Sequence, residues 1–488
     1  MPANTECLWT SARRLWRTSA WAAAIGAAAA MLGSAVWAQG ADPNAPAVRL
    51  INLIPINGTS AKPTTKMYSF DISFVDPTPF AGHPDGLYYL ADRSNAALDV
   101  IDIATETVFG QIGGNGPLQA NFTGDTGSTN TSGPDGVAAA YPCIFAGNGN
   151  STLLSFNGAV DFTKVVTRLN TGGKFRVDEM AIDPADGLVI AANNADDPPF
   201  STIVTYNKTT CALSNPIKTT FSALPGGHMN TNGIEQSVWD PGTQRFYISL
   251  PEIDGVGPTA GGAGKTGAVA RVTTGGVIET IYPINFMQPA GLTLGPNGNL
   301  LVGSNSVFDN SGKKCTAVLP SACLAETPGP TPAAGACMTG STPPGAPATC
   351  FGGTAYPQVA ICNPAKGCTP GPSLVSVFGV GGGDEVWFNG GTDNNYYVTA
   401  GNNPIGPTFG VVNASTNTLT QLVPTVPPVP ATVPPTPPGH SAGTAHSIAA
   451  STANNHVYVP LPANSNYTAP PLGTPACIQG CVAVFSAQ

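Results

Sequence analysis

The chain has 488 residues, of which only 10% are charged and 42% are hydrophobic, and it contains 58 glycines and 48 prolines. A chain of this length and apolar content can bury a large core, and so many glycines and prolines indicate short strands joined by turns. The net charge of −9 argues against nucleic acid as a partner, because its phosphates would be repelled.

The first 38 residues have the features of a signal peptide. Three arginines precede an apolar, Ala-rich stretch at residues 21–35, and residues 36–38 are typical of a cleavage site before Gln39. The apolar stretch is short for a membrane span. We therefore expect cleavage, a single domain over residues 39–488 without a membrane span, and a periplasmic or secreted location. The Arg13-Arg14 pair leaves the twin-arginine route open beside the general one.

One phrase recurs along the rest of the chain: a short apolar strand, a tight turn and a second apolar strand. Two looser copies begin at Phe70 and Gly136. The clearest copies occupy residues 180–193, 237–250, 292–304, 386–399 and 448–460. A third strand follows most copies, and often a fourth. Such repeated four-stranded units predict the blades of a β-propeller, whereas a β-sandwich does not need the same phrase seven times.

The two ends of this repeat complement one another. The last copy has only three strands, the third at residues 481–486, and residues 48–54 form a spare strand before the first copy. We therefore predict an all-β, seven-bladed β-propeller closed by its N-terminal strand, which removes an open sheet edge. Two segments interrupt the pattern: a Cys-, Pro- and Gly-rich insertion at 307–355, within the fifth blade, and a Pro-rich connection at 423–439 that should be extended.

Cysteine usage agrees with export. One of the 11 cysteines lies in the expected signal peptide, and the other ten are an even number, which favours disulfides. Cys362 and Cys368 bracket one tight turn, and Cys477 and Cys481 bracket another, so both pairs could close locally. Zinc is the alternative, but the paired Cys-x2-Cys spacing of zinc sites is absent.

Three phrases carry a resemblance to a known family. Residues 178–184 (DEMAIDP), 194–200 (NADDPPF) and 445–449 (AHSIA) resemble the repeats of YVTN-type, or YncE-like, propellers, which are secreted bacterial proteins of seven blades. The resemblance covers about residues 48–488, although the tetrapeptide that names the family occurs only in altered form, as at 457–460. It implies the fold and export, but no particular reaction.

Aligning the copies on their turns brings polar residues into one register. Equivalent positions in a closed ring converge on its central channel, and carboxylate and amide oxygens are ligands that Ca²⁺ or another divalent cation prefers. The candidate metal ligands are Glu179, Glu235, Asp384 and Asp178. The further candidates for a ligand-binding face are Asp71, Asn193, Asn194, Asp196, Glu385 and His446. Alternatively, these groups only cap strands and hydrogen-bond loop amides across blades.

Two functions follow from this pattern. The first is an exported, monomeric binding scaffold for an unknown protein or small-molecule ligand, using an acidic face. The second is a divalent-cation-dependent hydrolase at the channel mouth, as in propeller lactonases of the gluconolactonase type, whose metal polarises an ester carbonyl. The sequence identifies no catalytic residue, and no cofactor beyond this candidate cation.

Overall fold

The computed structural model describes eleven stretches of the chain: residues 48–58, 65–255, 266–307, 316–317, 354–355, 358–371, 373–381, 383–401, 407–425, 445–463 and 477–487. The expected signal peptide and most of the two expected interruptions lie outside them. The described residues form β-strands and three short 3-10 turns, η1 (Pro225–Gly227), η3 (Pro296–Gly298) and η4 (Pro364–Lys366). No described helix is long and apolar enough to cross a membrane.

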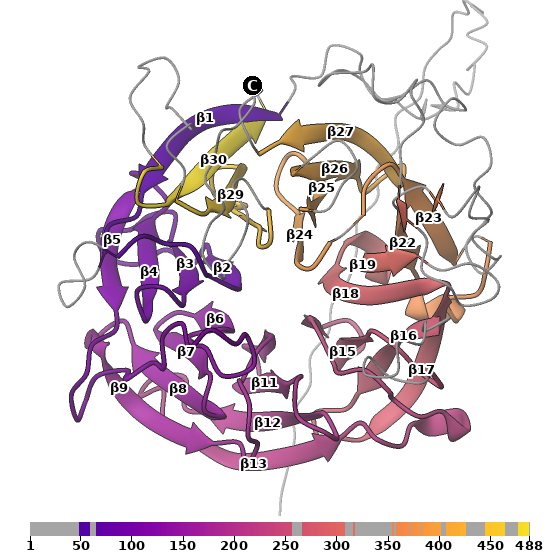
Figure 1. Ribbon diagram of the computed structural model, residues 1–488, viewed down its shortest axis with the longest axis horizontal. Coiled ribbons are helices and arrows are strands. Elements are labelled where there is room, and N and C mark those ends of the chain that lie inside the picture. The colour runs from indigo at the N-terminus through magenta and orange to yellow at the C-terminus, as the bar shows by residue number, and fades with distance from the viewer. Residues whose placement is uncertain are drawn as a thin grey trace, which may run out of the picture. The chain divides into compact units, whose positions relative to one another are not determined.

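Seven four-stranded antiparallel sheets in the described residues surround a common centre (Figure 1). This confirms the predicted all-β, seven-bladed propeller. Blade 1 consists of β2 (Ser73–Asp76), β3 (Leu87–Asp92), β4 (Ala97–Asp102) and β5 (Thr107–Ile112). Blade 2 consists of β6 (Val137–Ala140), β7 (Cys143–Asn148), β8 (Thr152–Asn157) and β9 (Asp161–Asn170). Blade 3 consists of β10 (Met180–Asp183), β11 (Leu188–Asn193), β12 (Phe200–Tyr206) and β13 (Leu213–Thr220).

The remaining blades follow the same order from the centre outwards. Blade 4 consists of β14 (Ser237–Asp240), β15 (Arg245–Leu250), β16 (Thr266–Val272) and β17 (Ile278–Asn285). Blade 5 consists of β18 (Met287–Leu294), β19 (Leu300–Val307), β22 (Gln358–Cys362) and β23 (Leu374–Phe378). Blade 6 consists of β24 (Val386–Asn389), β25 (Asn395–Ala400), β26 (Thr408–Asn413) and β27 (Thr418–Pro424). Blade 7 consists of β28 (Ala449–Ala450), β29 (His456–Leu461), β30 (Cys481–Ala487) and β1 (Val48–Pro55). Between β19 and β22 the chain also forms a small parallel pair, β20 (Thr316–Ala317) and β21 (Thr354–Ala355).

The core lies between the blades rather than inside any one of them. All six residues of β3 are buried, whereas the first three of the outer strand β5 are exposed. A middle strand covered on both faces has no polar face, which explains the near-continuous apolar runs of the sequence. The described residues contain seven buried apolar clusters, one for each pair of adjacent blades. The ring is therefore held by interfaces of one kind, repeated around it.

Blade 7 takes its strands from both ends of the described chain. Strand β1 pairs antiparallel with β30, from Val48 opposite Ala487 to Pro55 opposite Cys481. Ile54 of β1 and Tyr458 of β29 join Tyr88 of blade 1 in the apolar cluster between blades 7 and 1. The N-terminal strand is thus the outermost strand of the last blade.

Three disulfides join cysteines of the described residues. Cys362–Cys368 and Cys477–Cys481 are the two local pairs predicted from the sequence, and both are confirmed. The third, Cys143–Cys211, spans 68 residues. It links the start of β7 in blade 2 to the loop between β12 and β13 in blade 3. The sequence did not predict it, because its two cysteines become neighbours only once the blades are packed.

Candidate functional site

The same local structure recurs where the chain enters the inner strands of blades 1 to 4. Asp178 stands two residues before β10, and its amide donates a hydrogen bond of 2.7 Å to the carbonyl of Ala192 in the next strand. Asp71 makes the equivalent bond, of 2.9 Å, to Ala91. We call these entry positions the upper ring. Its members are Asp71, Asp135, Asp178, Glu235, Asp384 and His446, and the aligned position in blade 5 is Ala290, which lies within β18.

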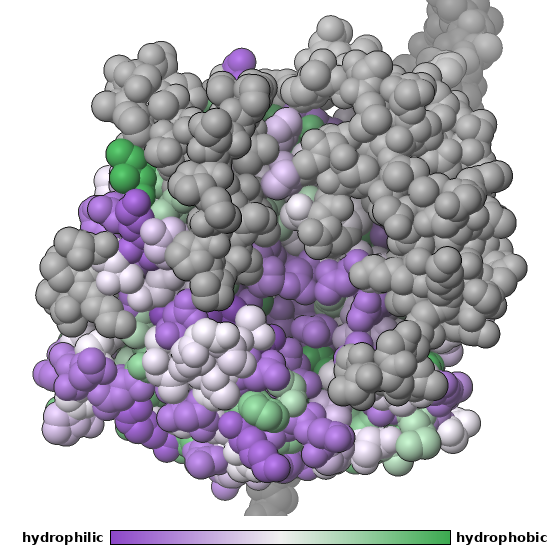
Figure 2. Space-filling model, in the orientation of Figure 1, coloured by the Kyte–Doolittle hydropathy of each residue, from purple (hydrophilic) through white to green (hydrophobic). Residues whose placement is uncertain are grey.

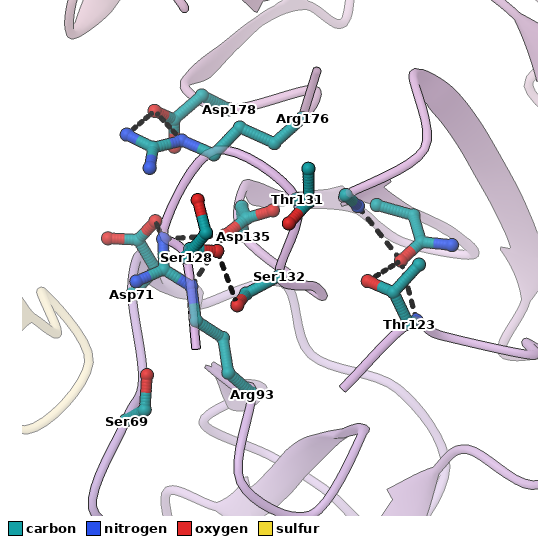
Figure 3. Close-up of polar contacts among 12 residues, drawn as sticks. Ser69, Asp71, Arg93, Thr123, Ser128, Thr131, Ser132, Asp135, Arg176 and Asp178 are labelled. Carbon is teal, nitrogen blue, oxygen red and sulfur yellow. Dashed lines mark hydrogen bonds and ion pairs between the residues drawn. The ribbon is translucent and has the colours of Figure 1, made fainter. Parts of the chain in front are cut away.

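A buried arginine joins two acids of the upper ring (Figure 3). Arg93, which is 3% exposed, donates from Nε to Oδ1 of Asp135 at 2.6 Å and from Nη2 to Asp71. Arg176 lies beside it and donates from both Nε and Nη2 to Oδ2 of Asp178, at 2.7 Å each. Arg93 therefore connects blades 1 and 2 at the channel, and Arg176 with Asp178 forms a second ion pair at the entry to blade 3.

His446 continues this network on the other side of Asp71. Its Nε2 lies 2.8 Å from Oδ1 of Asp71, and its Nδ1 lies 3.1 Å from Oδ2 of Asp384. Burial alone would lower the pKa of His446, but the charges of Asp384 and Asp71 outweigh burial and raise it to about 9. Burial would likewise raise the pKa of Asp71, but Arg93 and His446 hold it well below its ordinary value. Asp71 is therefore ionised and His446 protonated at neutral pH.

The residues that directly follow the upper-ring positions form a second layer, which we call the lower ring. Its polar members are Glu179, Gln236, Glu385 and Ser447. Two of them connect blades. Oε1 of Gln236 accepts hydrogen bonds from the amides of Leu292 at 2.6 Å and Val386 at 3.1 Å. Oε2 of Glu385 accepts from Ser447 and from the amide of Ile448 at 3.1 Å. Burial raises the pKa of Glu385 to about 8, so this carboxyl is mostly neutral at pH 7.

Glu179 differs from its neighbours in the lower ring. It is 4% exposed, yet its carboxyl makes no hydrogen bond or ion pair with any described residue. Burial and then the nearby acids, Glu385 first, raise its pKa well above the ordinary value. The carboxyl of Glu235, which is partly exposed in the upper ring, also has no such partner within the described chain, and burial and then Asp384 raise its pKa.

The candidates on the next loop have another role. Asn193 donates from Nδ2 to the carbonyl of Arg176 at 3.2 Å and accepts from Thr171 at 2.8 Å. Asp196 accepts from the amide of Lys174 at 2.8 Å. Both residues fix the backbone that carries Arg176 and belong to neither ring. Asn194 is buried, and its Oδ1 has no hydrogen-bond partner in the described structure.

The predicted metal ligands are brought to the same centre, but two of them are already engaged. Asp178 pairs with Arg176, and Asp384 contacts His446 and accepts from Asn305 at 3.1 Å. Within the described stretches, no group of three or more His, Cys, Asp or Glu side chains is arranged to hold a metal ion. A divalent cation at Glu179 and Glu235 stays a prediction.

Sequence reasoning missed three members of this network. Asp135 stands two residues before β6, as its counterparts do before their strands, but it lies in a looser copy of the repeat. Arg93 and Arg176 lie in loops that do not repeat. A signal was available for both arginines: the chain has only 19 Lys and Arg residues, and these two lie close in sequence to aligned polar positions. In Figure 2, hydrophilic residues gather at the part of the central hollow that grey atoms do not cover.

Comparisons with known proteins support the fold and go no further. No protein-family model matches the chain, and no curated protein matches it. The solved structure titled "Kuenenia stuttgartiensis Hydrazine Synthase" is 10% identical, with a TM-score of 0.50, over 84% of this chain and 96% of that one. "Structure of U3-55K" is 9% identical, with a TM-score of 0.46, over 90% and 98%. At 10% identity the first likeness shows the shared fold alone, and the second is too distant to carry an argument.

Proposed function

We propose that this protein is an exported binding propeller of the YVTN type that takes a small polar ligand at the mouth of its central channel. The carrying observation is the network of Arg93 and Arg176 among the carboxyl groups of blades 1 to 3. Buried ion pairs seldom stabilise a fold more than apolar residues would. The seven apolar clusters already hold the ring together. Charge concentrated at one convergent point is typical of a recognition site.

Export is supported by two independent features. The described residues contain three disulfides, which persist in oxidising compartments. The first 38 residues have the charge and apolar pattern of a signal peptide. Binding outside the cytoplasm also agrees with the resemblance to secreted YVTN-type propellers.

A thermal-shift screen of the full chain tests the binding function. Separate sets of amines, carboxylates, sugars and divalent cations are added to the wild type and to a variant carrying Arg176→Met and Asp178→Asn. A ligand that binds the native state raises the melting temperature by mass action. We expect at least one compound to stabilise the wild type and not the variant. If no compound does so, or if both proteins respond equally, the proposed site is wrong.

We do not extend the proposal to metal-dependent hydrolysis. That function requires oxygen ligands from several blades around one cation, and the described residues hold no such group of acidic, His or Cys side chains. The divalent-cation set of the screen addresses this alternative directly.

A further inference from the structure

Glu179 is the one long polar side chain of the described lower ring without a structural task. Gln236 bonds the amides of blades 5 and 6, and Glu385 bonds those of blades 7 and 1. Glu179 occupies the equivalent position in blade 3 and is almost fully buried, and its carboxyl bonds to no described group. Of the long polar side chains in the described lower ring, it is therefore the one left available for a partner from outside the chain.

The charges around Glu179 define what that partner must be. The acids that act on it most strongly are Glu385, Asp178, Asp71 and Glu235. Arg176, a cation of the described network, is bound to Asp178 through two of its nitrogens. Burial and these like charges raise the pKa of Glu179, which is the response of a carboxyl that lacks a cation beside it. The missing partner is therefore positively charged.

Glu235 supplies a second free carboxyl from the adjacent blade. It lies one layer above Glu179, in the upper ring, and its own carboxyl bonds to no described residue. The inner strands β10 and β14, which the two acids precede, pack against each other, and Glu235 is among the acids that act on Glu179, so one ligand group can approach both. Resting on the binding function proposed above, we propose that Glu179 and Glu235 together bind the ammonium group of a small aliphatic amine.

An ammonium group suits these residues better than a metal ion does. Ca²⁺ requires six to eight oxygen ligands at about 2.3–2.6 Å, and the described residues provide no metal-holding cluster. An ammonium group has three N–H donors and is satisfied by two or three acceptors at ordinary hydrogen-bond distances. The carboxyl groups of Glu179 and Glu235 can supply that number of acceptors.

Calorimetric titration of the full chain with 1,4-diaminobutane tests this inference. The uncharged 1,4-butanediol is the matched control ligand. Glu179→Gln and Glu235→Gln keep the size of each side chain and remove its charge. Glu279→Gln is the control variant, because Glu279 pairs with Arg245 near the outer strand of blade 4. We expect the diamine to bind, the diol not to bind, and each ring variant to weaken diamine binding by about 10- to 100-fold, as loss of a charged hydrogen bond does.

Three results would overturn the inference. Equal binding of diamine and diol, or unchanged diamine affinity in both ring variants, would overturn the inference. Binding of CaCl₂ with no binding of the diamine would identify a metal site and overturn it too. In those cases the binding function stands if another compound of the screen stabilises the wild type. It fails independently if none does. Melting temperatures of the Gln variants at or above the wild-type value would show that they fold.

Discussion

At the residue scale, the decisive feature is a guanidinium group buried between two blades. Arg93 contacts both Asp71 and Asp135, and all three side chains are at most 5% exposed. Removing one partner of a buried ion pair leaves an uncompensated charge. Loss of Arg93 should therefore reduce the free energy of unfolding by more than the loss of its own hydrogen bonds would.

We predict that Arg93→Met destabilises the protein by about 3–5 kcal/mol, because Asp71 and Asp135 are left buried without their cation. Arg245→Met is the matched control. Arg245 forms a partly exposed pair with Glu279, and the loss of such pairs costs about 0–1 kcal/mol. Urea unfolding of both variants measures the difference. Equal destabilisation of the two would contradict the importance assigned to the buried network.

The sequence could predict some members of the two rings and not others. Asp71, Asp178, Glu235, Asp384 and His446 stand at a fixed distance from repeated turns, so alignment alone brings them together. Asp135 belongs to a less regular copy, and the arginines reach the centre from loops whose paths the repeat does not determine. Arg176 and Asp178 form an ion pair between side chains, and the spacing of residues in the sequence does not predict such a contact.

At the scale of elements, the strands were the most predictable part. The expected copies at 180–193 and 237–250 begin and end at the same residues as the strand pairs β10–β11 and β14–β15. Short β-branched and aromatic runs between turn residues specify them locally. Cys143–Cys211 was not predictable in this way, because it depends on which blades are neighbours.

We predict unequal effects from removing the disulfides. In the chain-entropy treatment, a disulfide stabilises by restricting the unfolded chain, and more so for longer loops. Replacing both Cys143 and Cys211 by Ala, which opens a loop of 68 residues, should cost about 4 kcal/mol. The same change at Cys362 and Cys368, separated by 6 residues, should cost about 2 kcal/mol. Denaturant titrations of the two double variants compare them, and a larger loss from the local pair would refute this ordering.

At the scale of the whole molecule, three titratable groups near the channel change the pH dependence of stability in the same direction. Burial raises the pKa of Asp178 to about 6 and that of Glu385 to about 8. The acids around His446 raise its pKa to about 9 against the effect of burial. All three groups bind protons more tightly in the folded protein than in the unfolded chain. Proton binding by these groups therefore stabilises the folded state at low pH, and this stabilisation is lost as the pH rises.

We predict that the free energy of unfolding is greatest near pH 4–5 and falls up to about pH 9. The unfolded chain releases the proton of Glu385 near its ordinary pKa of 4.5 and that of His446 near 6.5, whereas the folded protein keeps both longer. Each group then contributes a loss of up to about 1.4 kcal/mol per pH unit between its two pKa values. Below pH 4 the lowered pKa of Asp71 reverses the trend.

Melting temperatures measured from pH 4 to pH 9 test this profile. Glu385→Gln provides the internal comparison, because an amide of the same shape cannot titrate. The variant should lose less stability than the wild type between pH 5 and pH 8. A wild-type melting temperature that rises with pH over this range would show that the buried carboxyls are ionised in the folded state.

The pairing of β1 with β30 has a consequence for the order of folding. The outermost strand of blade 7 is synthesised first and its pairing partner last (Figure 1). Blades 1 to 6 are each continuous in sequence and can form as the chain emerges, but the seventh must wait for the final strand. Until then β1 presents an unpaired edge, which is open to other strands. The pairing that completes the ring is thus the last one that the order of synthesis allows, and we expect β1 to be the strand most open to wrong pairing before β30 is made.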